Sequence, residues 1–117
     1  MKPPKVNLVP KTVDLAVYAG DGATVRITVN GGDMTDGVVE AQIRTNRLDA
    51  DPIDEFVVDV TADPGSVLLS LTGAQTEALL NGNNGYQGAW DMQWTPTGHE
   101  PVTLVQGKLT VVADVTR

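Results

Sequence analysis

Hydrophobic and polar residues alternate along most of this chain with a period of two, which is typical of strands with one buried face. The clearest example is the segment 23–30, in which we expect Val25, Ile27 and Val29 to face inward. Segments rich in glycine and proline separate the alternating runs and indicate turns. The pattern predicts seven strands, over residues 12–18, 23–30, 38–45, 55–61, 66–71, 86–95 and 102–113.

One segment departs from this alternation and predicts a short helix over residues 72–80. Thr72 is a favourable N-cap, and Gln75 follows three positions later, so the two side chains can form a capping box. The sequence Asn81-Gly82-Asn83-Asn84-Gly85 then ends the helix and reverses the chain. The helix therefore falls in the connection between the fifth and sixth predicted strands.

These elements predict an all-β fold, a seven-stranded antiparallel immunoglobulin-like β-sandwich with one short helix that crosses its end. We assign residues 12–117 to this domain and residues 1–11 to an extended, basic, proline-rich N-terminal arm. The hydrophobic phase of the last strand slips near Gln106-Gly107, which predicts a β-bulge at that point.

Composition limits the classes of function. A chain of 117 residues is one domain, and because it has no cysteine, neither a disulfide scaffold nor a cysteine-based metal site is expected. No apolar run approaches the roughly 20 residues of a membrane span, and the N-terminus lacks the apolar region of a signal peptide. We therefore expect no membrane partner.

Charge is distributed unevenly along the chain. Eight basic and fifteen acidic residues give a net charge of −7, which argues against nucleic acid as a partner. The arm contains Lys2, Lys5 and Lys11 and no acidic residue, so the remaining five basic and fifteen acidic residues carry a net charge of −10. The arm is interpreted either as docking on a neighbouring copy or complementary surface, or as a solvated terminus.

Four acidic residues cluster between the third and fourth predicted strands: Asp49, Asp51, Asp54 and Glu55. Such a group could bind calcium, but its spacing lacks the glycine and the terminal glutamate of an EF-hand loop. It could instead be the docking site for the basic arm of a neighbouring copy, through contacts that salt would weaken. The third interpretation is a solvated acidic loop, and we assign no metal site.

No residue constellation indicates catalysis. The single histidine, His99, lies in a predicted hairpin loop that offers little orientation for a catalytic triad. Trp90 and Trp94 share one strand face, where they either fill a core that has a single phenylalanine or stack on sugar rings. We expect a protein without enzyme activity and without a cofactor.

Several segments occur here in a distinctive order. After the Gly20-Asp21-Gly22 turn come Ala41-Gln42-Ile43-Arg44, the run Leu69-Ser70-Leu71-Thr72-Gly73-Ala74-Gln75-Thr76, and the terminal Asp114-Val115-Thr116-Arg117. In this order and spacing the chain resembles small β-sandwich virion proteins of tailed bacteriophages, notably those of actinobacteria. It is also similar to the N-terminal attachment domain of phage baseplate upper proteins. The resemblance covers about residues 12–117.

The resemblance implies a structural role in the head or tail of a virion that is assembled in the cytoplasm of the bacterial host. We expect a capsid decoration or cementing protein, that is, a minor capsid protein, which binds the major capsid protein and copies of itself. Many weak contacts repeated over a shell add up to strong binding. The alternatives are a tail or baseplate attachment protein, and a carbohydrate- or host-surface-binding module. Baseplate upper proteins continue into further modules, so a chain that ends with the last strand favours a stand-alone part.

Overall fold

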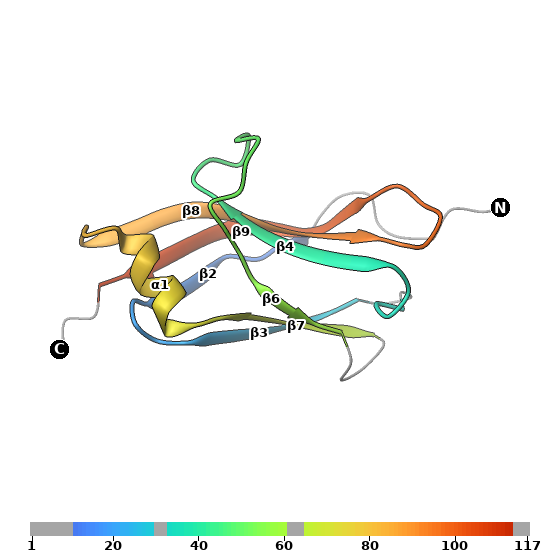
Figure 1. The fold of residues 1–117 in the computed structure, drawn as a ribbon, viewed down its shortest axis with the longest axis horizontal. Coiled ribbons are helices and arrows are strands. Elements are labelled where there is room, and N and C mark those ends of the chain that lie inside the picture. Colours follow the sequence, from blue (N-terminus) through green and yellow to red (C-terminus); the bar gives the residue numbers. More distant parts are fainter. Residues whose placement is uncertain (1–10, 30–32, 61–64, 114–117) are drawn as a thin grey trace.

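A computed structural model describes residues 11–29, 33–60 and 65–113. These residues form two β-sheets that face each other, with one short helix, α1, at one end (Figure 1). The elements are β1 (Lys11–Thr12), β2 (Leu15–Tyr18), β3 (Ala23–Thr28), β4 (Val38–Arg44), β5 (Asp54–Glu55), β6 (Val57–Asp59), β7 (Ser66–Leu71), α1 (Gly73–Leu80), β8 (Gly85–Thr95) and β9 (Val102–Val112).

The larger sheet has the order β1-β9-β8-β4-β5, with β2 also paired to β9, and the smaller sheet has the order β3-β7-β6. The second and fifth predicted strands and most of the fourth thus lie in one sheet, while the third, sixth and seventh lie in the other, as in immunoglobulin-like sandwiches. The all-β sandwich with one helix, predicted from the alternation, is confirmed.

The first predicted strand differs from the expectation in two ways. It is divided into β1 and β2, and both pair with β9 in parallel, so the sandwich is not wholly antiparallel. Lys11, which was predicted to belong to the arm, lies in β1 opposite Val105, and residues 1–10 lie outside the described residues. Strand direction depends on which edge a segment joins, and the alternation of a single strand does not carry that information.

The fourth predicted strand, over residues 55–61, is also divided. β5 pairs with β4 in the larger sheet, whereas β6 pairs with β7 in the smaller one. Phe56 lies between them and is buried in the core, as predicted. Its burial anchors the crossing of the chain from one sheet to the other; Thr61 lies outside the described residues.

The predicted bulge at Gln106-Gly107 is in the wrong place. The register between β8 and β9 shifts between Met92 and Gln93, which pair with Val105 and Thr103, so the extra residue on β9 is Leu104. Gly107 itself pairs regularly with Trp90. The inward phase therefore changes between Val102 and Val105, at this bulge, and Gly107 keeps the phase of Val105 and Leu109. Glycine is needed at 107 because backbone packs against it: a Cβ there would overlap the carbonyl oxygen of Val13.

The core lies between the sheets and consists of the side chains that the alternation assigned to the inner faces. Its members include both tryptophans, whose rings are at most 4% exposed. Met34 and Ala19, in segments predicted as a loop and a turn, are also buried and close the two ends of the sandwich. The residues with no exposed surface in the core are Ile43, Val67, Leu69, Met92, Leu109 and Val111.

The helix has the predicted capping box. The Gln75 backbone N–H donates to the Thr72 hydroxyl over 3.1 Å, and the Thr72 backbone N–H donates to the Gln75 side-chain oxygen over 2.9 Å. Asn81 ends the helix in a left-handed conformation with φ of 48°. The helix joins β7 of the smaller sheet to β8 of the larger one, as expected for the connection between the fifth and sixth predicted strands. No helix in the described part of the chain has the length and apolar character to span a bilayer.

A buried threonine attaches this helix to the turn between β2 and β3. The Gly20 backbone N–H donates to the Thr76 hydroxyl over 3.0 Å, and that hydroxyl lies 3.0 Å from the carbonyl oxygen of Asp21. Gly73 makes the approach close enough, because a Cβ on it would overlap the Gly20 carbonyl. Helix and turn therefore pack backbone to backbone, through a contact that helical periodicity does not predict.

Replacing Thr76 with valine is expected to lower the free energy of unfolding by about 1–3 kcal/mol, because the Gly20 N–H loses a buried acceptor while the volume is kept. Urea unfolding monitored by circular dichroism measures this loss. Thr76→Ser retains the hydroxyl and is the matched control for the hydrogen bonds. A Thr76→Val variant as stable as the parent would contradict the role of this contact.

Candidate binding site

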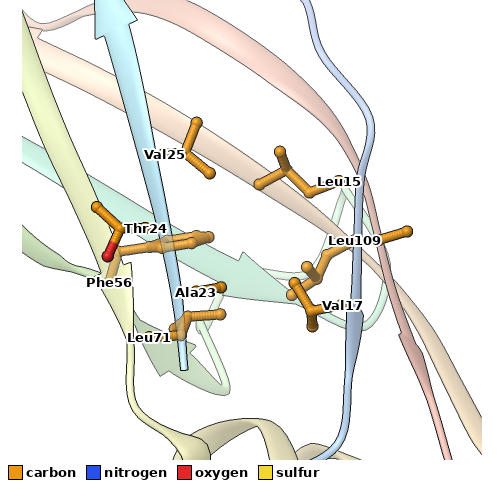
Figure 2. Close-up of a pocket in the computed structure, with 9 residues that line it drawn as sticks. Leu15, Val17, Ala23, Thr24, Val25, Phe56, Leu71 and Leu109 are labelled. Atoms are coloured by element: carbon orange, nitrogen blue, oxygen red, sulfur yellow. The ribbon is translucent and has the colours of Figure 1, made fainter. Parts of the chain in front are cut away.

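An open groove lies along one side of the sandwich, between β2 of the larger sheet and β3 of the smaller sheet (Figure 2). Apolar side chains from both strands point into it, and Phe56, Leu71 and Leu109 also contribute to its lining. Its volume is about 230 Å³. The other lining residues are Leu15, Ala16, Val17, Ala23, Thr24 and Val25.

The two strands that flank the groove are sheet edges. Among the described residues, β2 pairs with β9 and β3 pairs with β7, so each presents one side without a strand partner. The turn at residues 19–22 connects β2 to β3 across the sandwich. An unpaired edge is a template for another extended segment.

The lining indicates what the groove can accept. It offers aliphatic and aromatic carbon, with Thr24 as the polar member. Its volume of about 230 Å³ is below the roughly 300–1,000 Å³ typical of small-molecule pockets. The combination of free edges and a shallow apolar groove suits a peptide strand, whose backbone pairs with an edge and whose alternate side chains enter the groove.

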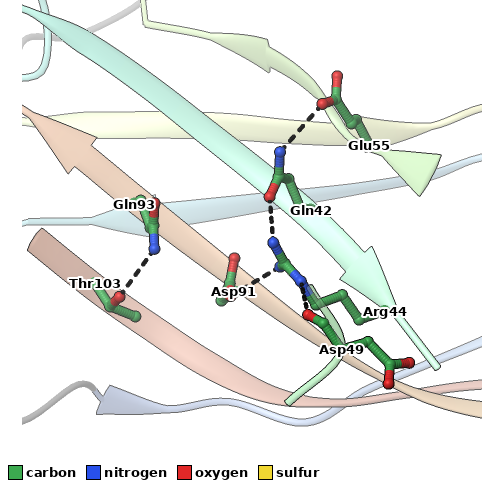
Figure 3. A network of polar contacts seen from close by, with 7 residues as sticks. All are labelled: Gln42, Arg44, Asp49, Glu55, Asp91, Gln93 and Thr103. Carbon is green, nitrogen blue, oxygen red and sulfur yellow. Dashed lines mark hydrogen bonds and ion pairs between the residues drawn. The ribbon is translucent and has the colours of Figure 1, made fainter. Parts of the chain in front are cut away.

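A polar network covers part of the outer face of the larger sheet (Figure 3). Arg44 is at its centre: its guanidinium donates to Asp91 over 3.2 Å, to Gln42 over 2.8 Å and to the carbonyl oxygen of Asp49 over 3.0 Å. The Gln42 amide in turn donates to Glu55 over 3.3 Å. The network joins β4, β8 and β5 to the loop at residues 45–53, and it therefore holds this loop against the sheet.

Two opposing effects set the pKa of Asp91. Partial burial raises this pKa above its ordinary value of 3.8, and the positive charge of Arg44 offsets part of the rise. The folded carboxyl thus holds its proton more tightly than the unfolded one. Its contribution to stability is therefore present below pH 3.8 and is lost as the pH rises through the folded-state pKa.

Replacing Arg44 with methionine is expected to raise the pKa of Asp91 further, because burial is retained while the compensating charge is removed. The interval above pH 3.8 over which stability falls should therefore extend to higher pH. Carbon-13 NMR titration of the Asp91 carboxyl measures the shift directly. Arg47→Met, in the exposed loop after β4, should leave it unchanged, and a lower pKa in Arg44→Met would contradict the explanation.

The acidic residues of the predicted docking loop do not form one cluster. Asp49 lies at the Arg44 network and accepts the backbone N–H of Asn46 over 3.0 Å. Asp54 accepts the side-chain amide of Gln75 over 3.1 Å, so it faces the helix. Asp51 is exposed. Across residues 11–29, 33–60 and 65–113, no three acidic or histidine side chains are arranged to hold a metal ion.

The other residues singled out from the sequence are an acidic residue, three lysines and the histidine. Glu55 is exposed at the sheet edge and binds Gln42, while Lys11 is exposed in β1. Lys2 and Lys5 lie outside the described residues. His99 lies half-buried in the loop between β8 and β9, where the sequence predicted a loop.

The tryptophans are core residues. Trp90 and Trp94 are 2% and 4% exposed. Their indole N–H groups donate to backbone carbonyl oxygens, of Val13 over 2.9 Å and of Asp36 over 2.7 Å. A ring in this position cannot stack on a sugar, so the carbohydrate-binding alternative based on these two residues is wrong.

Sequence reasoning missed the groove. Most of its lining residues were predicted to face inward, but Thr24 was predicted to face outward, and an inward face predicts burial and not a gap at the sandwich side. The one usable signal was composition: Ala16 and Ala23, which line the groove on the edge strands of the two sheets, are small.

No protein-family model matches the chain, and no curated protein matches its sequence.

Proposed function

We propose that this protein is a structural component of a tailed-phage virion that acts by binding, as a capsid decoration protein on the major capsid protein. The observation that carries the proposal is the open apolar groove between two unpaired sheet edges, which is a geometry for docking protein segments. The resemblance of residues 12–117 to phage sandwich proteins supports the virion as the setting.

Charge adds a second line of support. The first ten residues contribute Lys2 and Lys5 without an acid, and Lys11 follows at the start of β1, while the rest of the chain is strongly acidic. Opposite charges favour contacts between neighbouring copies or with a complementary surface. The acidic positions Asp51 and Glu55 are exposed and open to such a contact. Repetition over a shell would multiply the effect of each weak contact.

Tail or baseplate attachment is the second candidate, because the same resemblance includes the attachment domain of baseplate upper proteins. Electron microscopy of virions labelled on this protein separates the two, since a capsid position gives on the order of hundreds of copies and a tail position a few dozen at most. Label on the shell with high copy number is the expected result. Label confined to the tail would favour the second candidate, and its absence from virions would overturn the proposal.

A further inference from the structure

We propose that residues 5–9 of one chain insert as an added β-strand into the groove between β2 and β3 of a second copy of this protein. The segment is Lys5-Val6-Asn7-Leu8-Val9. The inference goes beyond the proposed function, because self-association can be measured on the isolated protein whether or not it belongs to a virion.

The composition of the segment matches the groove. Val6 and Leu8 are two positions apart, so both face the same side of an extended strand. The groove is lined mainly by aliphatic side chains and, at about 230 Å³, accepts side chains rather than a large ligand. Asn7 would then face away from the groove. An alternation of this kind is what a strand added to a sandwich edge requires.

The prolines define the limits of the inserting segment. Pro3-Pro4 precede it and Pro10 follows it, and proline has no backbone N–H to donate to a sheet. Residues 5–9 lack proline, so each of them can pair with an edge. A residue that precedes proline is restricted to extended conformations, which favours a strand up to Val9.

The geometry of β1 favours a second copy over the same chain. β1 and β2 follow β9 in a single register, with Lys11 opposite Val105 and Leu15 opposite Leu109. Leu15 lines the groove, and Lys11 lies four residues before it on the same edge. At roughly 3.3 Å per residue, Lys11 is therefore about 13 Å from the groove along the strand. Residues 5–9 could reach the groove of their own chain only through a sharp reversal at Pro10, directly beside the paired β1.

Charge and length are compatible with exchange between copies. Ten residues precede Lys11 and can span up to about 35 Å when extended, enough to reach a neighbouring subunit. Lys2 and Lys5 would bring positive charge to a body in which acids outnumber bases. Reciprocal insertion would give a closed dimer, and sequential insertion would give a ring or chain.

Cysteine trapping tests the insertion directly, because the natural chain has no cysteine. Full-length Leu8→Cys is mixed with full-length Ala23→Cys, in which the new thiol lines the groove, and the mixture is oxidised. A covalent heterodimer on a non-reducing gel is the expected result. Ala89→Cys makes the same change on the outer face of the larger sheet and should give at least tenfold less heterodimer.

Two arm variants test the alternation without altering the sandwich. Leu8→Asp should weaken self-association at least tenfold in sedimentation experiments, because a carboxylate would enter the apolar groove. Asn7→Asp adds the same charge at the neighbouring position and should change self-association less than twofold. A folded circular dichroism spectrum in both variants excludes unfolding as the cause.

Three results would overturn the inference. A full-length protein that is monomeric at all concentrations would exclude exchange between copies. An intrachain disulfide in the Leu8→Cys, Ala23→Cys double variant, without heterodimer in the mixture, would place the segment in its own groove. Equal effects of Leu8→Asp and Asn7→Asp would show that charge and not insertion drives association. None of these results bears on where the protein lies in a virion, so the two proposals fail independently.

Discussion

Replacing Trp90 with alanine is expected to lower the free energy of unfolding by about 4 kcal/mol, the largest effect of any single substitution proposed for this chain. The indole is 2% exposed, and its ring lies 5.5 Å from that of Phe56 at an interplanar angle of 60°. Its N–H also donates to the Val13 carbonyl oxygen over 2.9 Å. The truncation therefore opens a cavity and leaves a backbone acceptor without its partner.

The loss is a large part of the roughly 5–15 kcal/mol that stabilises a typical domain. Urea unfolding followed by the fluorescence of Trp94, which remains in the variant, measures it. Trp90→Phe keeps an aromatic ring but removes the N–H, so it should lower the free energy of unfolding by about half as much as Trp90→Ala does. Val57→Ala, at a position 60% exposed, is the surface control and should change stability by less than about 0.5 kcal/mol. A loss below about 1 kcal/mol in Trp90→Ala would contradict the assigned role.

Replacing Gly107 with alanine should lower the free energy of unfolding by about 2–3 kcal/mol and loosen the first strands from β9. A Cβ at this position would overlap the carbonyl oxygen of Val13 and lie 3.1 Å from a carboxylate oxygen of Asp14. The obstacle is backbone, so it cannot rotate away. Two hydrogen bonds are expected to weaken, from the Val13 N–H to Gln106 over 2.9 Å and from the Lys108 N–H to Asp14 over 2.9 Å.

Hydrogen exchange at the Val13 and Lys108 amides reports this local loosening, and urea unfolding reports the global loss. Gly22→Ala is the matched control, because its Cβ would meet the nearest atom, the Leu71 carbonyl oxygen, at an ordinary 3.5 Å. It should leave both amides protected. Faster exchange at the two amides in Gly22→Ala, or none in Gly107→Ala, would contradict the explanation.

These two substitutions act on one contact, and that contact is where the sequence was hardest to interpret. Trp90, Gly107 and the Val13 carbonyl meet where the first strand divides into β1 and β2. The hydrophobic pattern changes its phase at Leu104 and lacks a side chain at Gly107, which together indicated an irregularity in this part of the strand. The bulge at Leu104 and the close backbone approach at Gly107 lie near each other and both interrupt the run of inward side chains, so the pattern alone could not separate them.

The groove also combines features that the local sequence predicts with features that it does not predict. The inward positions of Leu15, Val17 and Val25 could be predicted, since each follows the alternation of its own strand. That β2 and β3 become facing edges of different sheets could not, because edge positions depend on pairing between distant segments. In the groove, segments that are distant in sequence lie together, whereas in the acidic loop residues that are close in sequence lie apart. Asp49 and Asp54, for example, have different partners.

Local patterns of residues are sufficient to specify the strands and the helix of this protein. Period-two alternation specified the strands, and the Thr72–Gln75 capping box specified the helix, because both depend on neighbours within a few residues. Three features became visible only in the folded chain: the parallel attachment of β1 and β2, the crossing of the chain at Phe56 and the groove between two sheet edges. These features arise from contacts between segments that are far apart in the chain, and no local pattern of hydrophobic and polar residues encodes which edge a strand will join.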